Sequence, residues 1–449
     1  MKLLKIGISG VRGIVGETIV PELVMDFACA FGTYLDSKKV LVGRDTRISG
    51  PMLHEATLAA LVSTGCTVFD LGICPTPIIQ YMVKNLKAKG AVSITAGHND
   101  LTWNALTFIN QDGTYLNMFQ GEEVLDIYHQ GKFTKVTVDH LGRIESIDDY
   151  LDFYLKKLKK FLNSEAITRA KFKVVIDPCN GAGAKIIDSF SQQLGFELIP
   201  VNNEPNGYFP HDPEPRPRNA QEVASVMKIV NADVGFLLNS DASRVSLVAE
   251  NGETLSEEFT LPLIANYYLD KDPGIVVTNH SSSRMIEEVA RVKNCPVVKV
   301  KVGQSYSIQS LINEDGVLAG EGSGGIAIPE FQSAFDDFLN MGLILEIMAV
   351  RNKKISELVE ELPRYHIVKE KLYCPPTKIH SVVNEAKKLY AGRSIDTSDG
   401  IKIEDKDGWV HVRASATEPM IRVIAEDRSK EKAKERIEEV LNFISVLVK

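Results

Sequence analysis

A strand–loop–helix pattern that restarts three times along the chain constrains the fold most strongly. Apolar runs typical of buried strands begin near residues 39, 172 and 274, and each is followed by a loop and then a helical stretch. With 449 residues, the chain is also too long to form a single hydrophobic core. We therefore expect an α/β protein with three similar α/β domains built on mixed sheets.

The end of the chain differs from these three units. We expect strands near residues 400–403, 409–413 and 421–425, followed by a charged amphipathic helix that Ser429 can cap. This order predicts a smaller α+β domain at the C-terminal end. The four expected domains span residues 1–147, 148–252, 253–366 and 367–449.

Composition and charge exclude several classes of function. The hydrophobic fraction of 44% and the charged fraction of 24% are those of an ordinary soluble protein. A net charge of −8 argues against a nucleic-acid-binding surface. The six cysteines form no C-x-x-C pair, which favours reduced thiols over a zinc ribbon or a disulfide framework. No signal peptide and no membrane helix of roughly 18 apolar residues is evident. We expect a cytoplasmic protein that binds neither nucleic acid nor membrane.

Two loops at strand ends carry the most informative residues. Loop 95–100 reads T-A-G-H-N-D and follows an expected strand at 91–94. Loop 239–244 reads N-S-D-A-S-R and follows an expected strand at 234–238. Open α/β sheets bind their ligands at the carboxyl ends of strands, so both loops are candidate ligand sites.

Both loops belong to a set of segments that together resemble the α-D-phosphohexomutase superfamily. Loop 95–100 is similar to the family's phosphoserine loop, T-A-S-H-N-P, and loop 239–244 to its metal loop, D-G-D-A-D-R. The resemblance covers nearly the whole chain and implies four domains around a central cleft. The other matching segments are G-I-S-G-V-R-G at 7–13, G-R-D-T-R-I-S-G at 43–50, K-V-G at 301–303, G-E-G-S-G at 320–324 and R-A-S-A-T-E-P-M-I-R at 413–422.

The resemblance implies that the chain binds a phosphorylated hexose. Arg12 would help to hold a phosphate near loop 95–100, and Lys301 would lie near the substrate. Glu321 and Ser323 would bind sugar hydroxyls. The last matching segment would clamp the distal phosphate of the ligand with side-chain and backbone donors. The residues of this clamp would be Arg413, Ser415, Thr417 and Arg422.

The chain departs from the family pattern where the family's chemistry takes place. Gly97 occupies the phosphoserine position and has no side chain to carry a phosphoryl group, although His98 beside it is kept. In the metal loop Asp241 remains, while Asn239 and Ser243 replace two aspartates. A hard cation prefers charged oxygen ligands. We therefore expect Mg²⁺, the family's cofactor, to bind weakly or not at all.

Two hydroxyls, on Thr95 and Ser240, are the available substitutes for the missing nucleophile. Thr95 lies two residues before Gly97, so its Cβ is about 6–7 Å away on an extended chain, and the sequence positions no base beside Ser240. A lysine that follows the family's loop is also lost, at Thr107. Neither substitute is favoured.

We therefore expect a protein that binds a hexose phosphate in a binding or regulatory role, with weak or absent mutase turnover. Its protein partner would be a second copy of the chain or an active paralogue. The alternative is an active phosphosugar mutase, an intramolecular phosphotransferase that moves phosphate between the 1- and 6-positions of glucose, mannose or glucosamine.

Overall fold

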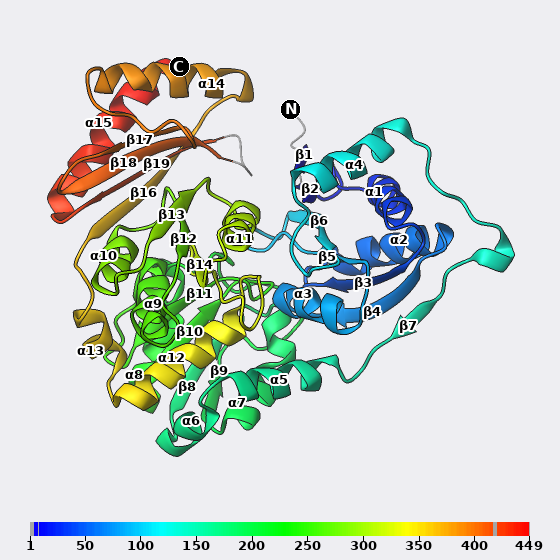
Figure 1. The fold of residues 1–449 in the computed structure, drawn as a ribbon, viewed down its shortest axis with the longest axis horizontal. Coiled ribbons are helices and arrows are strands. Elements are labelled where there is room, and N and C mark those ends of the chain that lie inside the picture. Colours follow the sequence, from blue (N-terminus) through cyan, green and yellow to red (C-terminus); the bar gives the residue numbers. More distant parts are fainter. Residues whose placement is uncertain (1–3, 8, 416–419, 449) are drawn as a thin grey trace. The chain divides into compact units, whose positions relative to one another are not determined.

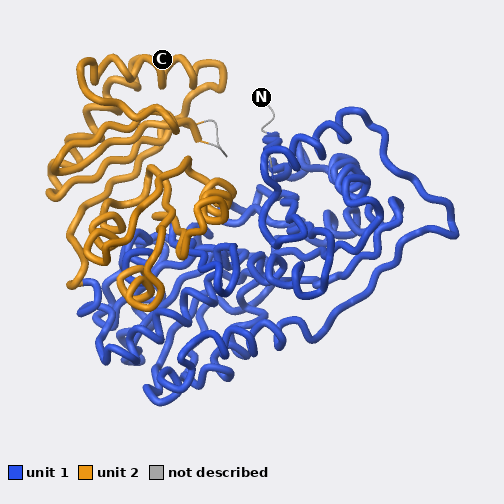
Figure 2. Tube along the Cα trace, viewed as in Figure 1, with its two compact units in different colours: residues 1–264, 323–359 blue, residues 265–322, 360–449 orange. Residues whose placement is uncertain are grey.

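The computed structural model describes residues 4–7, 9–415 and 420–448 (Figure 1). The chain divides into two compact units (Figure 2). Unit 1 holds residues 1–264 and 323–359, and unit 2 holds residues 265–322 and 360–449. Within the described ranges, no helix is both long and apolar enough to cross a lipid bilayer.

Unit 1 begins with a seven-stranded mixed sheet in the order β1-β2-β6-β5-β3-β4-β7. Strands β5, β3, β4 and β7 run parallel, while β1, β2 and β6 pair antiparallel, and β6 also pairs antiparallel with β5. The strands are β1 (Leu4–Gly7), β2 (Gly10–Ile14), β3 (Lys39–Arg44), β4 (Thr67–Ile73), β5 (Gly90–Ile94), β6 (Trp103–Asn110) and β7 (Ile144–Ser146). The helices are α1 (Pro21–Tyr34), α2 (Gly50–Ser63), α3 (Thr76–Asn85) and α4 (Met118–Gln130).

The second sheet of unit 1 has the order β11-β10-β8-β9, with β11 antiparallel to β10 and the other pairs parallel. Its strands are β8 (Lys173–Asp177), β9 (Glu197–Pro200), β10 (Val234–Leu238) and β11 (Val245–Ala249). Helix α12 packs against α6 and β11. The remaining elements of unit 1 are α5 (Tyr150–Phe161), α6 (Ser164–Ala170), α7 (Ile187–Leu194), α8 (Gln221–Val230), β15 (Ile326–Ala327), α12 (Asp337–Arg351) and α13 (Ile355–Glu360), which ends at the unit boundary.

Unit 2 contains a parallel group of strands, β13-β12-β14, and a four-stranded antiparallel sheet, β16-β19-β18-β17. Helices α14 and α15 pack on the antiparallel sheet (Figure 1). The elements are α9 (Thr260–Lys271), which begins in unit 1, and then β12 (Val276–Asn279), α10 (Met285–Val292), β13 (Val297–Val300), α11 (Gln304–Asn313), β14 (Leu318–Gly320), β16 (His366–Tyr373), α14 (Pro376–Ala386), β17 (Ile401–Glu404), β18 (Gly408–Ala414), β19 (Met420–Asp427) and α15 (Lys430–Val448). Short 3-10 turns occur at Val138–His140, Ala182–Lys185, Pro217–Asn219, Glu257–Phe259 and Lys387–Tyr390.

The architecture confirms the fold class expected from the sequence. The first two sheets are mixed, and the smaller C-terminal domain is a sheet covered by helices. The Ser429 hydroxyl accepts a hydrogen bond from the backbone N–H of Lys432 (3.4 Å), as expected of a residue that caps α15. The sequence pattern did not reveal β16, because its side chains are mostly half-buried or exposed and include several charges.

Candidate functional site

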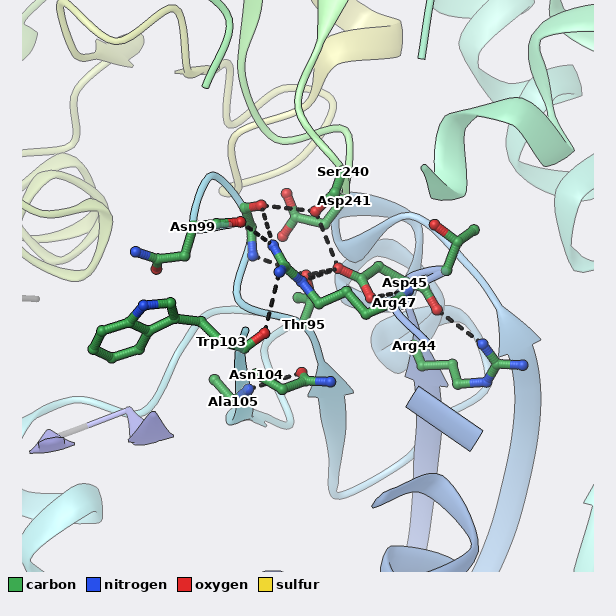
Figure 3. A network of polar contacts seen from close by, with 12 residues as sticks. Arg44, Asp45, Arg47, Thr95, Asn99, Trp103, Asn104, Ala105, Ser240 and Asp241 are labelled. Atoms are coloured by element: carbon green, nitrogen blue, oxygen red, sulfur yellow. Dashed lines mark hydrogen bonds and ion pairs between the residues drawn. The ribbon is translucent and has the colours of Figure 1, made fainter. Parts of the chain in front are cut away.

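A buried ion pair fixes the shape of loop 95–100. Asp45 and Arg47 follow β3, both side chains are fully buried, and Nε of Arg47 lies 3.0 Å from Oδ2 of Asp45. The guanidinium also donates to four backbone carbonyls between residues 97 and 103, and Figure 3 labels Asn99 and Trp103 among them. These carbonyls belong to Gly97 (2.8 Å), Asn99 (2.6 Å), Trp103 (3.1 Å) and Asp100. The 43–50 segment therefore holds the loop in place, and it contains the structural salt bridge that was one of two interpretations of its sequence.

Gly97 faces the loop that resembles a metal site. Its backbone is left-handed, with φ +54°, and a Cβ at this position would lie 3.7 Å from Nδ2 of Asn239 and 3.7 Å from each carboxylate oxygen of Asp241. These are ordinary van der Waals distances, so there is space for a Cβ at position 97, although the left-handed backbone would strain it. The structure thus brings positions 97, 239 and 241 together, in the relation that the family resemblance implies.

Residues of the metal-like loop, 239–244, form hydrogen bonds with one another. Oδ1 of Asp241 accepts from Nδ2 of Asn239 (2.8 Å) and from the Ser243 hydroxyl (2.8 Å), and Oδ2 accepts from the Thr76 hydroxyl (3.0 Å). Oδ1 of Asn239 accepts from the backbone N–H groups of Ser243 (2.8 Å) and Arg244 (3.2 Å). Both oxygens of the one carboxylate in the loop are therefore already hydrogen-bonded.

This donor set differs from the one that Mg²⁺ prefers. The ion favours charged oxygen ligands in near-ideal octahedral geometry, whereas the loop offers one carboxylate whose oxygens both accept hydrogen bonds. In the described part of the chain, no group of three or more His, Cys, Asp or Glu side chains is arranged to hold a metal. Asn239 and Ser243, which replace carboxylates, act here as hydrogen-bond donors to Asp241.

The expectation that no base lies beside Ser240 is wrong. The Ser240 hydroxyl lies 3.0 Å from Oδ2 of Asp45, and the Thr95 hydroxyl lies 2.6 Å from the same oxygen. Asp45 is 195 residues from Ser240 in the sequence, so only the fold reveals this contact. Both hydroxyls are nevertheless buried, and Asp45 is paired with Arg47. Their present contacts hold the loop rather than present a nucleophile to a ligand.

Positive charge gathers beside Gly97. Nη1 of Arg12 donates to Oδ1 of Asn99 (2.8 Å), so the neighbour of His98 anchors this arginine. Burial, with Arg47 and Arg244 nearby, lowers the pKa of Arg12 to about 10. His98 itself is half-buried in the same loop. Because the guanidinium groups of Arg12, Arg47 and Arg244 repel one another here, the site favours an additional anion.

A second buried carboxylate, on Asp337 at the start of α12, lies next to the metal-like loop. Its backbone N–H donates to the carbonyl of Ala242 (3.4 Å). Both carboxylate oxygens are buried and have no well-aligned hydrogen-bond donor among the described residues, although the backbone N–H of Arg244 lies nearby. Burial and then the neighbouring Asp336 and Asp241 raise the pKa of Asp337 well above its usual value. Asp337 is therefore favoured in its neutral form, and no local sequence pattern marks it.

In unit 2, several residues expected to bind the sugar belong to one polar cluster. Oε1 of Glu321 accepts from the backbone N–H of Gly303 (3.0 Å) and from the Ser307 hydroxyl (3.1 Å). Oδ2 of Asp399 accepts from the backbone N–H of Val302 (2.9 Å) and from Nε of Arg413 (3.2 Å). Asp399 thus connects the turn that contains Lys301 to the expected phosphate clamp.

The clamp arginines are cross-strand neighbours. Arg413 on β18 lies directly opposite Arg422 on β19, and like charges in this position repel each other. Burial lowers the pKa of Arg413, and Arg422 lowers it further. A bound phosphate would relieve this repulsion. The backbone N–H of Ser415 donates to the carbonyl of Met420 (2.9 Å), which closes the turn between the strands.

Three further residues were expected to contact the ligand: Ser323, Thr417 and Lys301. Ser323 belongs to unit 1, and its buried hydroxyl oxygen has no hydrogen-bond partner among the described residues. Thr417 lies outside the described residues. Nζ of Lys301 lies 6.0 Å from the centre of the Tyr306 ring, within the range of a cation–π contact.

Four family models cover the chain in order. They are phosphoglucomutase/phosphomannomutase α/β/α domain I at residues 3–135, domain II at 152–252, domain III at 256–365 and the C-terminal domain at 367–443. The chain belongs to the phosphoglucomutase/phosphomannomutase family. The expected four-domain phosphohexomutase fold is therefore confirmed.

Similar proteins span the chain from end to end. A phosphoglucomutase/phosphomannomutase of Thermococcus kodakarensis is 36% identical, and the match covers 96% of each chain. A probable phosphoglucosamine mutase of Pyrococcus abyssi is 33% identical, over 99% of this chain and 98% of the relative. A solved structure of a putative phosphomannomutase from Thermus thermophilus has a TM-score of 0.85 at 24% identity and covers 99% of this chain and 100% of that one.

These comparisons bear on the two expectations for function. Family membership at the level of phosphohexomutases is established, and the family normally uses Mg²⁺. Nothing in the comparisons indicates impaired turnover. They favour the alternative of an active phosphosugar mutase over the expectation of a binding protein without turnover.

Proposed function

We propose that this phosphohexomutase-family protein binds a phosphorylated hexose, and that position 97 takes no part as a carrier of the phosphoryl group. The observation that supports this most directly is the place of Gly97. A Cβ added at Gly97 would lie 3.7 Å from side-chain atoms of Asn239 and Asp241. The family resemblance places a phosphoserine at this position, whereas Gly97 has no side chain.

Each unit offers a site for an anionic group. In unit 1, the two positive charges of Arg12 and Arg244 outweigh the single negative charge of Asp241. In unit 2, Arg413 and Arg422 lie opposite each other on neighbouring strands. Arginine recognises phosphate with paired N–H donors, which suits both places. The hydroxyl-binding role of Glu321 and Ser323 and the clamp role of Ser415 and Thr417 remain predictions.

An active phosphosugar mutase is the second candidate function. It is supported by relatives named as mutases that match over nearly their whole length at 36% and 33% identity. On this proposal the chain interconverts hexose 1- and 6-phosphates, and the phosphoryl group is carried at a position other than 97. Binding of the substrate is common to both candidates, so turnover separates them.

Two measurements test the proposal. Purified protein is titrated with glucose 1-phosphate, mannose 1-phosphate and glucosamine 1-phosphate while its thermal unfolding is recorded. A ligand at 100 times its Kd adds about 2.7 kcal/mol to the free energy of unfolding. Turnover is then measured with Mg²⁺ and a hexose bisphosphate. A rate of about 1–10³ s⁻¹ would establish the mutase candidate, and no stabilisation by any of the sugars would contradict binding.

A matched pair of variants locates the ligand. Arg422→Ala removes one of the two opposed guanidinium groups and should abolish the thermal shift. Lys406→Ala removes a positive charge from an exposed turn of the same domain and should leave the shift unchanged. Equal shifts in both variants would show that the clamp is not used. The expected protein partner, a second copy or an active paralogue, stays a prediction that light scattering of the purified protein tests.

A further inference from the structure

Asp399 lies between two parts of unit 2 that the family resemblance assigns to ligand binding. Its Oδ2 accepts one hydrogen bond from Nε of Arg413 (3.2 Å) and a second from the backbone N–H of Val302 (2.9 Å). Arg413 belongs to the expected phosphate clamp, and Val302 to the turn that contains Lys301. The side chains of Asp399 and Arg413 are only 16% and 7% exposed, so water screens this ion pair less than a surface pair.

The fold holds Asp399 itself in a fixed position. Its backbone carbonyl accepts a hydrogen bond from Nε2 of His411 (2.5 Å), and the side chain of His411 is fully buried. The next residue, Gly400, has a left-handed backbone (φ +81°), and a Cβ there would lie 2.3 Å from the carbonyl oxygen of Val412. The backbone on both sides of this peptide is therefore closely packed, and the carboxylate has a defined starting point.

The contact through Nε fixes the orientation of the Arg413 guanidinium. The group is planar, so a carboxylate that engages Nε sets the direction in which the two terminal Nη groups point. Phosphate oxygens are recognised by pairs of such N–H donors. An arginine that is already oriented loses less side-chain freedom when it binds a ligand, and its affinity for that ligand is higher.

The position of Arg422 opposes this orientation. It lies directly opposite Arg413 on the neighbouring strand, where like charges repel each other. Burial lowers the pKa of Arg413 most strongly, Asp399 raises it, and Arg422 lowers it further. Asp399 therefore stabilises the charged form of Arg413 beside a second cation, and it does so through a contact that also sets the direction of the side chain.

We propose that Asp399 is a positioning residue for the phosphate clamp, which orients Arg413 towards the phosphate of a bound hexose phosphate. The N–H of Val302 anchors the carboxylate in turn. The family models place Val302 in domain III and Asp399 in the C-terminal domain, so this carboxylate joins the turn of one domain to the clamp of the other. The inference rests on the proposed function and deepens it, because it names the residue that prepares the clamp for an anion.

Two substitutions separate the position of the carboxylate from its charge. Both hydrogen bonds fall on Oδ2, so Asp399→Asn can keep them with its single carbonyl oxygen while the negative charge is lost. Asp399→Glu keeps the charge and displaces the carboxylate by one methylene group. If Asp399 acted only through its charge, Asp399→Asn would tighten the binding of an anion and Asp399→Glu would leave it unchanged.

The test is calorimetric titration of glucose 1-phosphate into the full-length protein and its variants, each first shown to be folded by thermal unfolding. We expect Asp399→Glu to raise the Kd by about 10-fold or more, and Asp399→Asn to raise it by less than about 3-fold. Glu438→Gln removes an exposed carboxylate of the same domain and should leave the Kd unchanged. In an Arg413→Lys background, which lacks Nε, Asp399→Glu should change the Kd by less than about 2-fold.

The inference is overturned if Asp399→Glu binds as tightly as the unmodified protein, or if Asp399→Asn binds more tightly. It is also overturned if Asp399→Glu has the same effect with and without Arg413→Lys, since Asp399 would then act through another group. Any of these results, with binding by the unmodified protein, refutes the positioning role and leaves hexose-phosphate binding supported. No binding by the unmodified protein refutes both.

Discussion

Restoring the two missing carboxylates should turn the metal-like loop into a magnesium site. In the double variant Asn239→Asp/Ser243→Asp, the donors that now reach Oδ1 of Asp241 at 2.8 Å are replaced by carboxylates. Two like charges about 4 Å apart repel by about 4 kcal/mol at an effective dielectric constant near 20. The free energy of unfolding of the metal-free variant should therefore be about 3–5 kcal/mol lower than that of the unmodified protein.

Magnesium should then recover much of this loss in the variant alone. At 100 times its Kd, the ion adds about 2.7 kcal/mol to the free energy of unfolding. The assay is urea denaturation in EDTA and in MgCl₂, for the unmodified protein, the double variant and Asn251→Asp. Asn251 is an exposed turn residue whose side-chain oxygen accepts from the backbone N–H of Glu253 (2.8 Å), a bond that aspartate keeps.

Two results would refute this reasoning. The first is a magnesium-dependent stabilisation of the unmodified protein equal to that of the double variant, because its hydrogen-bonded loop offers one carboxylate. The second is a double variant as stable as Asn251→Asp in EDTA, because three carboxylates would then coexist in the loop without cost.

Three further predictions follow from single contacts. Arg47→Met leaves the buried carboxylate of its partner unpaired and should lower the free energy of urea unfolding by about 3–5 kcal/mol, whereas the exposed Arg143→Ala should change it by less than about 1 kcal/mol. Gly97→Ser should cost about 1–2 kcal/mol for its left-handed backbone, while Gly113→Ser should cost more, since its Cβ would lie 2.5 Å from a backbone oxygen. Asp337→Asn should stabilise the protein increasingly as pH rises from 4 towards 8, measured by urea unfolding. The raised folded-state pKa of Asp337 stabilises the unmodified protein at low pH, and this stability is lost as the carboxyl ionises. A difference in unfolding free energy that does not depend on pH would contradict this.

Local sequence patterns were sufficient to predict most of the fold. Buried strands such as β5 and β10 are continuous apolar runs, and the loops after them carry polar residues at the strand ends. Strand β16 was not recognised, because its pairing with β19 is what defines it and its own residues are largely polar. Patterns within a segment reveal its own periodicity but not its partner.

The candidate site shows the same division. The motifs placed Gly97, Asn239 and Asp241 in one region, and the structure brings them together. The contacts that complete the site join distant residues, and no local pattern marks them. Oδ2 of Asp45 accepts a hydrogen bond from the Ser240 hydroxyl. Oδ2 of Asp399 accepts hydrogen bonds from the backbone N–H of Val302 and from Arg413 of the clamp.

The central claim is that the chain binds a hexose phosphate without Mg²⁺ and without a phosphoryl carrier at position 97. Calorimetric titration of glucose 1-phosphate into the protein, once in EDTA and once in MgCl₂, tests it most directly. We predict saturable binding with the same Kd in both buffers, and its loss in Arg422→Ala. Binding that occurs only in MgCl₂, or no binding in either buffer, would contradict the claim.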